Sequence, residues 1–380
     1  MQEVNHRVAI VMDSSRAYER GLITGILKYS RLHGPMHFWR KRGILSGGQE
    51  LITLKQLKNW KPDGIIWREG YKDISLKSLR VPGVVVPFTR PKKNQVNVVA
   101  DDESIGRKAA KYLLRRGFKH FGYYGYGDRC FFSRDRQRGF VSEVKAHGFS
   151  VSLCDRGDRD VISDWLGSSA TPLGLMVCTD DLAIDCYEAI NQLGYSIPQD
   201  CSIIGVGNDE LVCDFVSPSL SSIELRTPLA GYEAADALVR LIEGQKYENR
   251  IVCQVGEVVE RQSTSMLAVE DPFVARAIEY IQSHVSKNIH ASDVVKAVPV
   301  SRRSLYSRFQ QVMGSSIFEE IRRAKMAYAA RMLLETDLSV SEIADKLGYS
   351  EPKNLARIFR QEKGMAPHRY RQRYMAESLR

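Results

Sequence analysis

The C-terminal part of the chain contains one structural pattern twice, and this repeat limits the possible folds more than any other feature. Residues 292–309 read SDVVKAVPVSRRSLYSRF, and residues 341–359 read SEIADKLGYSEPKNLARIF. The copies are 49 residues apart at their first serine and 50 residues apart at their last phenylalanine. Two copies are too few for a solenoid, which needs stacked neighbours to bury its faces. The repeat instead predicts two helix-turn-helix units, each presenting a polar second helix.

The second helix of each copy has an apolar face and a polar face. We expect Ser301 and Ser350 to cap these helices. The core-facing residues should be Leu305, Phe309, Val312, Met313, Leu355, Ile358 and Phe359. The outward side chains are of types that read DNA, since Arg pairs with guanine and Asn with adenine. The candidate DNA-binding residues are Arg302, Arg303, Ser304, Tyr306, Ser307 and Gln310 in the first copy, and Lys353, Asn354, Arg357 and Arg360 in the second.

The segment between the copies predicts a long helix over residues 317–335 that holds the two units apart. Second helices about one DNA turn apart, ~34 Å, can enter successive major grooves of a double-stranded DNA. The strand and helix patterns of the preceding residues stop between Arg261 and Pro272, which indicates a linker. Pro272 suits the first turn of a further helix. We therefore expect an all-α domain over residues 269–380, preceded by another domain over residues 1–268.

The N-terminal domain alternates short apolar runs with amphipathic helix patterns. The expected strands cover residues 7–13, 63–69, 83–89, 96–102, 120–126, 174–180 and 202–208, and the expected helices cover 18–32, 104–115, 135–146 and 182–193. This alternation predicts parallel sheets with helices on both faces. Because it restarts near residue 117, we expect an α/β fold of two doubly wound lobes. The chain should cross between the lobes near 103–117 and again near 222–252.

Four of the expected strands end in polar side chains. These are Asp13, Asp101 with Asp102, Asp180 with Asp181, and Asn208 with Asp209. Ligands of doubly wound folds bind at the carboxyl ends of strands, so the four ends together favour a pocket for a polar ligand between the lobes. Each residue alone is equally well explained as a helix N-cap.

Composition narrows the class of protein further. Residues 270–380 hold 19 Lys and Arg against 13 Asp and Glu, whereas the remaining residues hold 36 and 32. A basic block fits a domain that contacts phosphates, although a solvated basic face is also common. The seven cysteines form no C-x-x-C pair, so we expect buried, reduced thiols and neither disulfides nor a metal site. Without a signal peptide or membrane span, the chain should be cytoplasmic and make no membrane contact.

The C-terminal domain resembles the AraC/XylS family of bacterial transcription regulators. The resemblance covers residues 272–374 and rests on A-x-x-L-G-Y-S from Ala344, F-x-x-x-x-G from Phe359 and P-x-x-Y-R from Pro367. One departure is Pro299, which stands in the first turn where the family usually has Gly. Proline cannot adopt a positive φ, so we expect that turn to differ from the second one.

Residues 7–262 resemble the periplasmic-binding-protein-like sensor domain of LacI-type repressors. The matching motifs are AYERGLITGI, D-x-x-x-G from Asp102, R-x-x-G-F from Arg136, T-D-D-x-A around Asp180 and I-x-G-V-x-N-D-E. The resemblance implies a carbohydrate between the lobes, with a xylose-like pentose as the first candidate. The implied ligand-binding residues are Asp13, Asp101, Asp102, Arg136, Asp180 and Asn208, with Tyr18, Trp67 and Phe88 as aromatic candidates that fit the core equally well.

A second departure concerns the expected sugar contact. Gly207 stands where this family commonly has Asp, which removes a side chain able to bind two hydroxyl groups. For Arg136, a helix arginine held in a salt bridge is the alternative to a ligand contact.

These expectations describe a sugar-responsive transcription activator that needs no cofactor. A homodimer packed through its sensor domains would place two C-terminal domains on paired promoter half-sites and act with RNA polymerase. The alternative is an AraC-type regulator whose sensor domain binds a non-sugar ligand or serves only for dimerisation. An enzyme is disfavoured, since the sequence has no nucleophilic Cys motif, no metal-ligand spacing and no G-x-G-x-x-G loop. An exported sugar-binding protein is disfavoured by the missing export signal and the basic C-terminal domain.

Overall fold

The computed structural model describes residues 6–40, 54–70, 79–266, 268–269 and 271–375. The chain divides into two compact units, one of residues 1–114 and 118–266 and the other of residues 115–117 and 267–380. We call them the sensor unit and the helical unit. Among the described residues, no helix is both long enough and apolar enough to span a bilayer.

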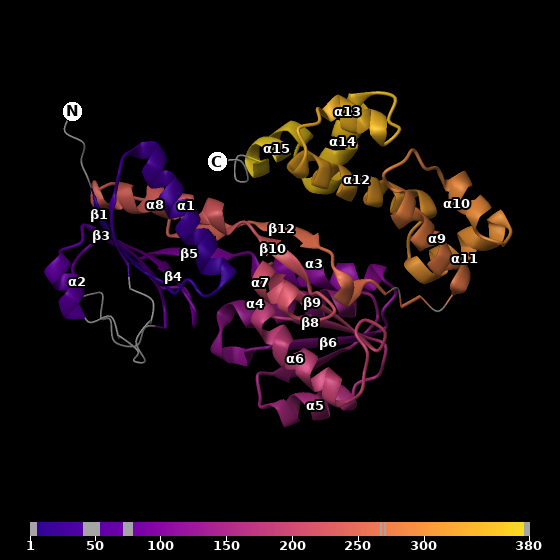
Figure 1. The fold of residues 1–380 in the computed structure, drawn as a ribbon, viewed down its shortest axis with the longest axis horizontal. Coiled ribbons are helices and arrows are strands. Elements are labelled where there is room, and N and C mark those ends of the chain that lie inside the picture. Colours follow the sequence, from indigo (N-terminus) through magenta and orange to yellow (C-terminus); the bar gives the residue numbers. More distant parts are fainter. Residues whose placement is uncertain (1–5, 41–53, 71–78, 267, 270, 376–380) are drawn as a thin grey trace. The chain divides into compact units, whose positions relative to one another are not determined.

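The first lobe of the sensor unit is built on a six-stranded parallel sheet (Figure 1). Its strand order is β11-β5-β4-β3-β1-β2. Every neighbouring pair is parallel, from β1 beside β2 to β11 beside β5. The strands are β1 (Arg7–Val11), β2 (His37–Arg40), β3 (Gly64–Arg68), β4 (Gly83–Val86), β5 (Val96–Ala100) and β11 (Arg250–Cys253).

The second lobe repeats this architecture in the order β12-β10-β9-β8-β6-β7. All neighbours are parallel except β12, which runs antiparallel to β10. The strands are β6 (His120–Gly125), β7 (Val151–Asp155), β8 (Leu173–Val177), β9 (Cys201–Gly207), β10 (Ser221–Leu225) and β12 (Val255–Val259). The expected pair of doubly wound sheets is confirmed.

Helices cover the sheets of both lobes, and one of them returns to the first lobe. The helices are α1 (Ala17–His33), α2 (Leu54–Trp60), α3 (Asp102–Arg115), α4 (Phe131–Ala146), α5 (Arg159–Gly167), α6 (Asp180–Gln192), α7 (Glu210–Phe215) and α8 (Thr227–Ile242). Helix α8 packs against α1, so the chain leaves the second lobe after β10 and re-enters it between β11 and β12. The last crossing, at Gln254, did not appear in the sequence pattern because β11 and β12 are separated by this residue alone.

The core of each lobe is apolar and contains reduced thiols. The central strands are almost wholly buried, as β5 and β8 are over their full length. All seven cysteines are buried thiols outside any disulfide, as the sequence predicted. Burial in apolar surroundings raises the pKa of Cys130 and Cys154 to about 11, which keeps these thiols protonated and unreactive.

The helical unit consists of two small cores joined by one long helix. The helices are α9 (Pro272–His284), α10 (Ala291–Ala297), α11 (Arg302–Met313), α12 (Ile317–Glu335), α13 (Val340–Lys346), α14 (Pro352–Lys363) and α15 (Pro367–Met375). Ile321 belongs to the first core with Leu305 and Phe309, whereas Leu333 belongs to the second with Phe359. Helix α12 therefore spans both helix-turn-helix units, as expected of a rigid spacer (Figure 1).

Helices α11 and α14 are the second helices of the two helix-turn-helix units, and we call them the reader helices. Three of their details differ from the sequence expectation. Val312, in the last turn of α11, is 39% exposed rather than buried. It lines a surface groove together with Arg308. Met313 and Ile358 are only half-buried. Ser350 is not the N-cap of α14; Glu351 holds that position without a side-chain hydrogen bond. The residue inserted in the second copy moves the helix start onward, and Pro352 occupies the first turn, where its missing N–H costs nothing.

The turns of the two helix-turn-helix units have different backbone conformations. In the second unit, Gly348 follows α13 with a φ of 76°, in the left-handed region. In the first unit, Val298 ends α10 with a φ of −111°, in the extended region. Pro299 requires this difference, because its ring excludes the left-handed turn.

The C-terminal motif stabilises the second unit. The ring of Tyr370 packs edge-on against Phe359 at 5.1 Å between centroids. Nε of Arg371 donates to the carbonyl oxygen of Leu333 at 3.0 Å, and Nη2 donates to that of Thr336 at 3.3 Å. Arg371 therefore satisfies carbonyl groups that the end of α12 leaves without helical partners.

Candidate ligand pocket and DNA-binding surface

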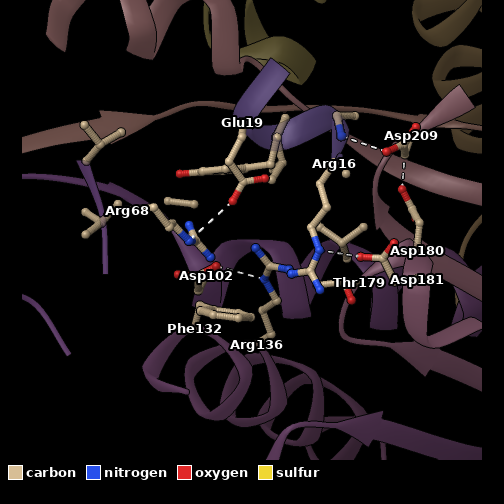
Figure 2. A pocket seen from close by; sticks show the side chains of 18 of the residues that line it. Arg16, Glu19, Arg68, Asp102, Phe132, Arg136, Thr179, Asp180, Asp181 and Asp209 are labelled. Atoms are coloured by element: carbon tan, nitrogen blue, oxygen red, sulfur yellow. Dashed lines mark hydrogen bonds and ion pairs between the residues drawn. The ribbon is translucent and has the colours of Figure 1, made fainter. Parts of the chain in front are cut away.

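A pocket lies in the sensor unit where strands of both sheets end (Figure 2). Its cavity volume is about 80 Å³. Since one water needs roughly 10–15 Å³ of such space, the cavity suits a small metabolite. Its charged lining residues are Arg16, Glu19, Arg68, Asp102, Arg136, Asp180, Asp181 and Asp209. Its apolar wall includes Tyr18, Pro87, Val98, Phe131, Phe132 and Leu225.

Two glycines bring the most deeply buried ion pair of the pocket together. A Cβ atom on Gly106 would lie 2.0 Å from the carbonyl oxygen of Arg136, and one on Gly139 would lie 2.1 Å from that of Glu103. Helices α3 and α4 can therefore approach closely only because both positions are glycine. This contact sets Asp102 opposite Arg136, which explains why the D-x-x-x-G and R-x-x-G-F motifs occur together.

Arg136 and Asp102 form a buried salt bridge. Nε of Arg136 lies 2.8 Å from Oδ1 of Asp102, and the two residues are only 5% and 4% exposed. Nη1 of Arg136 also donates to the carbonyl oxygen of Cys178 at 2.6 Å. Burial raises the pKa of Asp102 to about 6, against the opposing effect of Arg136. Burial alone lowers the pKa of Arg136, but Asp102 raises it above its ordinary value, so the guanidinium stays charged.

Asp180 contributes a buried carboxylate held by neutral hydrogen-bond donors. The hydroxyl of Ser222 donates to its Oδ1 at 2.6 Å, and the backbone N–H of Asp209 donates to its Oδ2 at 2.8 Å. Burial raises the pKa of Asp180 to about 6, although both hydrogen bonds lower it. This carboxyl group therefore titrates close to neutral pH.

The first lobe contributes the ion pair of Arg68 and Glu19. Nε of Arg68 lies 3.3 Å from Oε1 of Glu19. The guanidinium also lies over the rings of Tyr18 and Phe88, each at 5.5 Å from its centroid. Glu69, the residue after Arg68, helps to position Phe88, because its Oε2 accepts a hydrogen bond from the backbone N–H of Phe88 at 2.8 Å. Figure 2 shows Glu19 reaching from α1 toward Arg68.

Three further contacts join the start of the first helix to the second lobe. Oδ2 of Asp209 accepts from the backbone N–H of Ala17 at 2.7 Å, and Oδ1 lies 2.6 Å from Nη2 of Arg20. Nε of Arg16 lies 3.1 Å from Oδ2 of Asp181. These contacts link residues of the two lobes beside the pocket and favour this arrangement of the lobes.

Tyr18, Asp102, Arg136 and Asp180, four of the predicted ligand-binding residues, line the pocket, and Phe88 lies beside it. Asp13 is exposed and accepts from the backbone N–H of Ser15 at 3.1 Å, so it binds its own turn.

The structure does not bring the remaining three predicted residues to the pocket. Asp101 accepts from the hydroxyl of Ser104 at 2.7 Å and caps α3, as the alternative N-cap interpretation proposed. Trp67 packs against a hydrophobic cluster on the other face of the first sheet from its neighbour Arg68. Asn208, at a φ of 50°, accepts from Nη1 of Arg261 at 3.0 Å.

Sequence reasoning missed several residues of the pocket. Arg68 follows Trp67 in β3, and neighbouring residues of a strand face opposite sides of its sheet. We chose Trp67 as the pocket residue because an aromatic ring can pack against a sugar, whereas the structure places Arg68 in the pocket. Glu19 had no sequence signal, because an acidic residue in a first helical turn is usually explained by the helix dipole. Gly207 lines the pocket at a φ of 128°. This backbone conformation favours glycine over the Asp that the resemblance implied at this position.

The reader helices of the helical unit present their polar faces to solvent. The exposed candidates are Arg302, Arg303, Ser307, Gln310, Lys353, Arg357 and Arg360, whereas Ser304, Tyr306 and Asn354 are half-buried. Lys353 forms an ion pair with Glu351 at 2.8 Å, and its side chain is 79% exposed. No metal-binding group of three or more ligands occurs among the described residues.

Ser304 and Tyr306 also have structural roles in α11. The hydroxyl of Ser304 accepts from Nε of Arg308 at 3.1 Å, and Nη1 of Arg308 lies 2.7 Å from Oδ2 of Asp271. Tyr306 packs against the first core, and the guanidinium of Arg302 lies over its ring at 5.5 Å. Arg308 thus ties the first reader helix to the start of α9.

Comparisons with known proteins match both units. A model of the periplasmic binding protein-like domain matches residues 110–264, and a model of the helix-turn-helix domain matches residues 294–373. The xylose operon regulatory protein of Escherichia coli (strain K12) is 27% identical over 384 residues, covering 96% of this chain and 97% of that protein. The chain is a helix-turn-helix transcription regulator with a periplasmic binding protein-like domain.

Other comparisons agree with this assignment. The xylose operon regulatory protein of Haemophilus influenzae is 24% identical, with 98% of this regulator and 99% of that protein covered. The solved structure of the xylose-binding transcription activator xylR has a TM-score of 0.59 and 23% identity, covering 98% and 99% of the two chains. This structural match supports the fold, and the regulators matched in sequence are not enzymes.

Proposed function

We propose that this regulator is a transcription activator that responds to a small neutral sugar, with a pentose such as xylose as the effector. The observation that carries the proposal is the pairing of every arginine that lines the pocket. Each arginine of its lining is paired with a carboxylate: Arg16 with Asp181, Arg68 with Glu19 and Arg136 with Asp102. No cationic side chain is left over for an anionic ligand among these three.

The hydrogen-bonding groups of the pocket suit a polyhydroxyl ligand. A sugar hydroxyl both donates and accepts, so it can bind carboxylate oxygens and guanidinium groups at the same time. Phe131, Phe132 and Val98 provide an apolar wall for the C–H face of a sugar ring. The cavity volume of about 80 Å³ supports a monosaccharide over a longer saccharide.

The names of the relatives support a pentose. Two xylose operon regulatory proteins align with nearly the whole chain, and the matched solved structure is called xylose-binding. Gly207 removes one carboxylate that we expected in the pocket. The effector of this regulator therefore depends more on Asp180, Asp102 and Arg136.

Sugar binding would act by selecting one arrangement of the lobes. An effector that contacts residues of both lobes binds more tightly when the lobes are close together, and this difference in affinity favours that arrangement. A coupling of about 1–3 kcal/mol suffices to change promoter binding by roughly five- to 150-fold. In a homodimer packed through the sensor units, this change would reposition two helical units on paired half-sites and allow contact with RNA polymerase.

Isothermal titration calorimetry on the full chain tests the proposal. D-xylose, D-ribose, L-arabinose and D-glucose form the neutral panel, and xylonate and xylose 5-phosphate form the anionic panel. We expect one neutral pentose to bind at least tenfold more tightly than either anion. Binding of an anion alone would assign a different class of effector, and binding of none would leave the sensor unit as a dimerisation module.

A further inference from the structure

Glu19 is a buried carboxylate that the protein satisfies on one side only. The residue is 5% exposed, and its Oε1 lies 3.3 Å from Nε of Arg68. Its Oε2 is buried and has no hydrogen-bond partner among the described residues. The side chain lines the pocket, as Figure 2 shows. Glu19 is therefore a lining residue that carries an unpartnered buried acceptor.

An unsatisfied buried oxygen of this kind is costly for the protein alone. Leaving a buried polar group without its hydrogen bond costs about 1–3 kcal/mol, and more for a charged group. Burial accordingly raises the pKa of Glu19, although Arg68 opposes this effect. A ligand hydroxyl that donates to Oε2 removes the penalty. The cost in the empty pocket thus becomes a gain in affinity for a ligand with a donor at this point.

Glu19 also positions a donor next to its own free acceptor. The guanidinium of Arg68 is held by Oε1 of Glu19 and by the rings of Tyr18 and Phe88 on its faces. The guanidinium of Arg68 carries further N–H donors besides the Nε that lies 3.3 Å from Glu19. The pair therefore offers one acceptor and one donor side by side from the first lobe.

We propose that Glu19 is the specificity-determining carboxylate of the first lobe, where Oε2 accepts a hydrogen bond from one effector hydroxyl and Arg68 binds the adjacent oxygen. The inference rests on the proposed function only in that the effector is a sugar. It explains how the first lobe recognises a ligand although Asp13 and Asp101 bind their own turns. Arg136 and Asp180 then bind the ligand from the second lobe.

The test is a calorimetric comparison of the full wild-type chain with Glu19→Gln. The probes are the neutral sugar that binds wild type most tightly and its singly deoxygenated analogues. We expect Glu19→Gln to weaken binding of the parent sugar about ten- to hundredfold, as for loss of a hydrogen bond to a charged group. Wild type should bind one of the analogues more weakly than the parent sugar by this same factor. Glu19→Gln should bind that analogue and the parent sugar with equal affinity. Glu188→Gln, the same change on the exposed face of α6, should leave every affinity unchanged.

The outcomes separate contact from a purely structural role. Parent-sugar affinity within twofold of wild type in Glu19→Gln overturns the inference while the proposed function stands. Equal loss of affinity for the parent sugar and for every deoxy analogue shows that Glu19 only supports Arg68 or α1, which also overturns it. If Glu19→Gln melts well below wild type, the conservative Glu19→Asp should restore folding but not affinity. A wild-type chain that binds no sugar overturns both proposals.

Discussion

The ligand pocket and the DNA-binding surface both rely on arginine, but in opposite environments. In the pocket, Arg136 is 5% exposed and its charge is matched by Asp102 at 2.8 Å. On the reader helices, Arg303 and Arg357 are exposed. A buried pair is fixed before its ligand arrives, whereas an exposed arginine keeps its hydration and its rotamer freedom until a partner binds it. The difference teaches that a pocket mutation should alter both folding and binding, and a reader-helix mutation binding alone.

Removal of Arg136 should have the largest effect and would sharpen this comparison. Arg136→Ala leaves Asp102 buried without its cation, and breaking a buried pair in this way costs about 3–5 kcal/mol. We expect the free energy of unfolding of the sensor unit to fall by that amount and effector binding to be lost. Urea denaturation and calorimetry measure the two effects, and basal promoter affinity at a temperature where the variant is folded should stay close to wild type. Equal losses of basal DNA binding and effector response would break the comparison.

Removal of Arg357 should affect DNA binding without affecting folding. A bidentate contact to a base is worth about 1–3 kcal/mol, so Arg357→Ala should weaken binding of the promoter site by roughly ten- to hundredfold. The matched control is Lys287→Ala, which removes an exposed charge outside the reader helices. Electrophoretic mobility shifts against specific and random duplexes distinguish the two variants. Arg303→Ala should behave like Arg357→Ala, and an unchanged preference for the promoter site in both would contradict base contact.

The pH dependence of stability offers the smallest and most specific contrast. Burial raises the pKa of Asp180 to about 6, above the value of about 3.9 expected in the unfolded chain. The folded state therefore holds a proton that the unfolded state releases. The corresponding stability is present below pH ~4 and is lost as the pH rises through about 6.

The variant Asp180→Asn cannot titrate at this position. Between pH 4.5 and 7.5, the free energy of unfolding of wild type should fall by about 1–2 kcal/mol more than that of Asp180→Asn. Urea titrations at both pH values measure the difference. Parallel curves for the two proteins would show that Asp180 is ionised throughout this range. Its pKa would then be unaffected by burial, as for an exposed carboxylate.

Local sequence patterns predicted the helical unit well because its order is local. The 3.6-residue period of α11 and α14 separated buried Leu305 and Phe359 from exposed Arg303 and Arg357. The errors, at Val312 and Ser350, lie at helix ends, where a cap or a proline outweighs periodicity. The β-α alternation likewise predicted the two sheets, but not the single-residue return between β11 and β12.

The pocket was only partly predictable. Motifs found Asp102 and Asp180 at helix starts and Arg136 within α4. Asp101 has the same sequence context as Asp102, yet one caps a helix and the other lines the cavity. Neighbouring residues at a strand end point in different directions, and only the helix that follows determines which one faces the ligand.

The sequence by itself determined the class of the two units, the faces of the reader helices and the polar strand ends, since these follow from periodicities of two and 3.6 residues within one segment. Only the tertiary structure decided which charges meet in the pocket. Glu19 and Arg68, like Arg136 and Asp102, are distant in sequence and come together through helix and sheet packing. Burial then gives these carboxylates and guanidinium groups their altered pKa values and their role toward a ligand, because removal from water strengthens each contact they make.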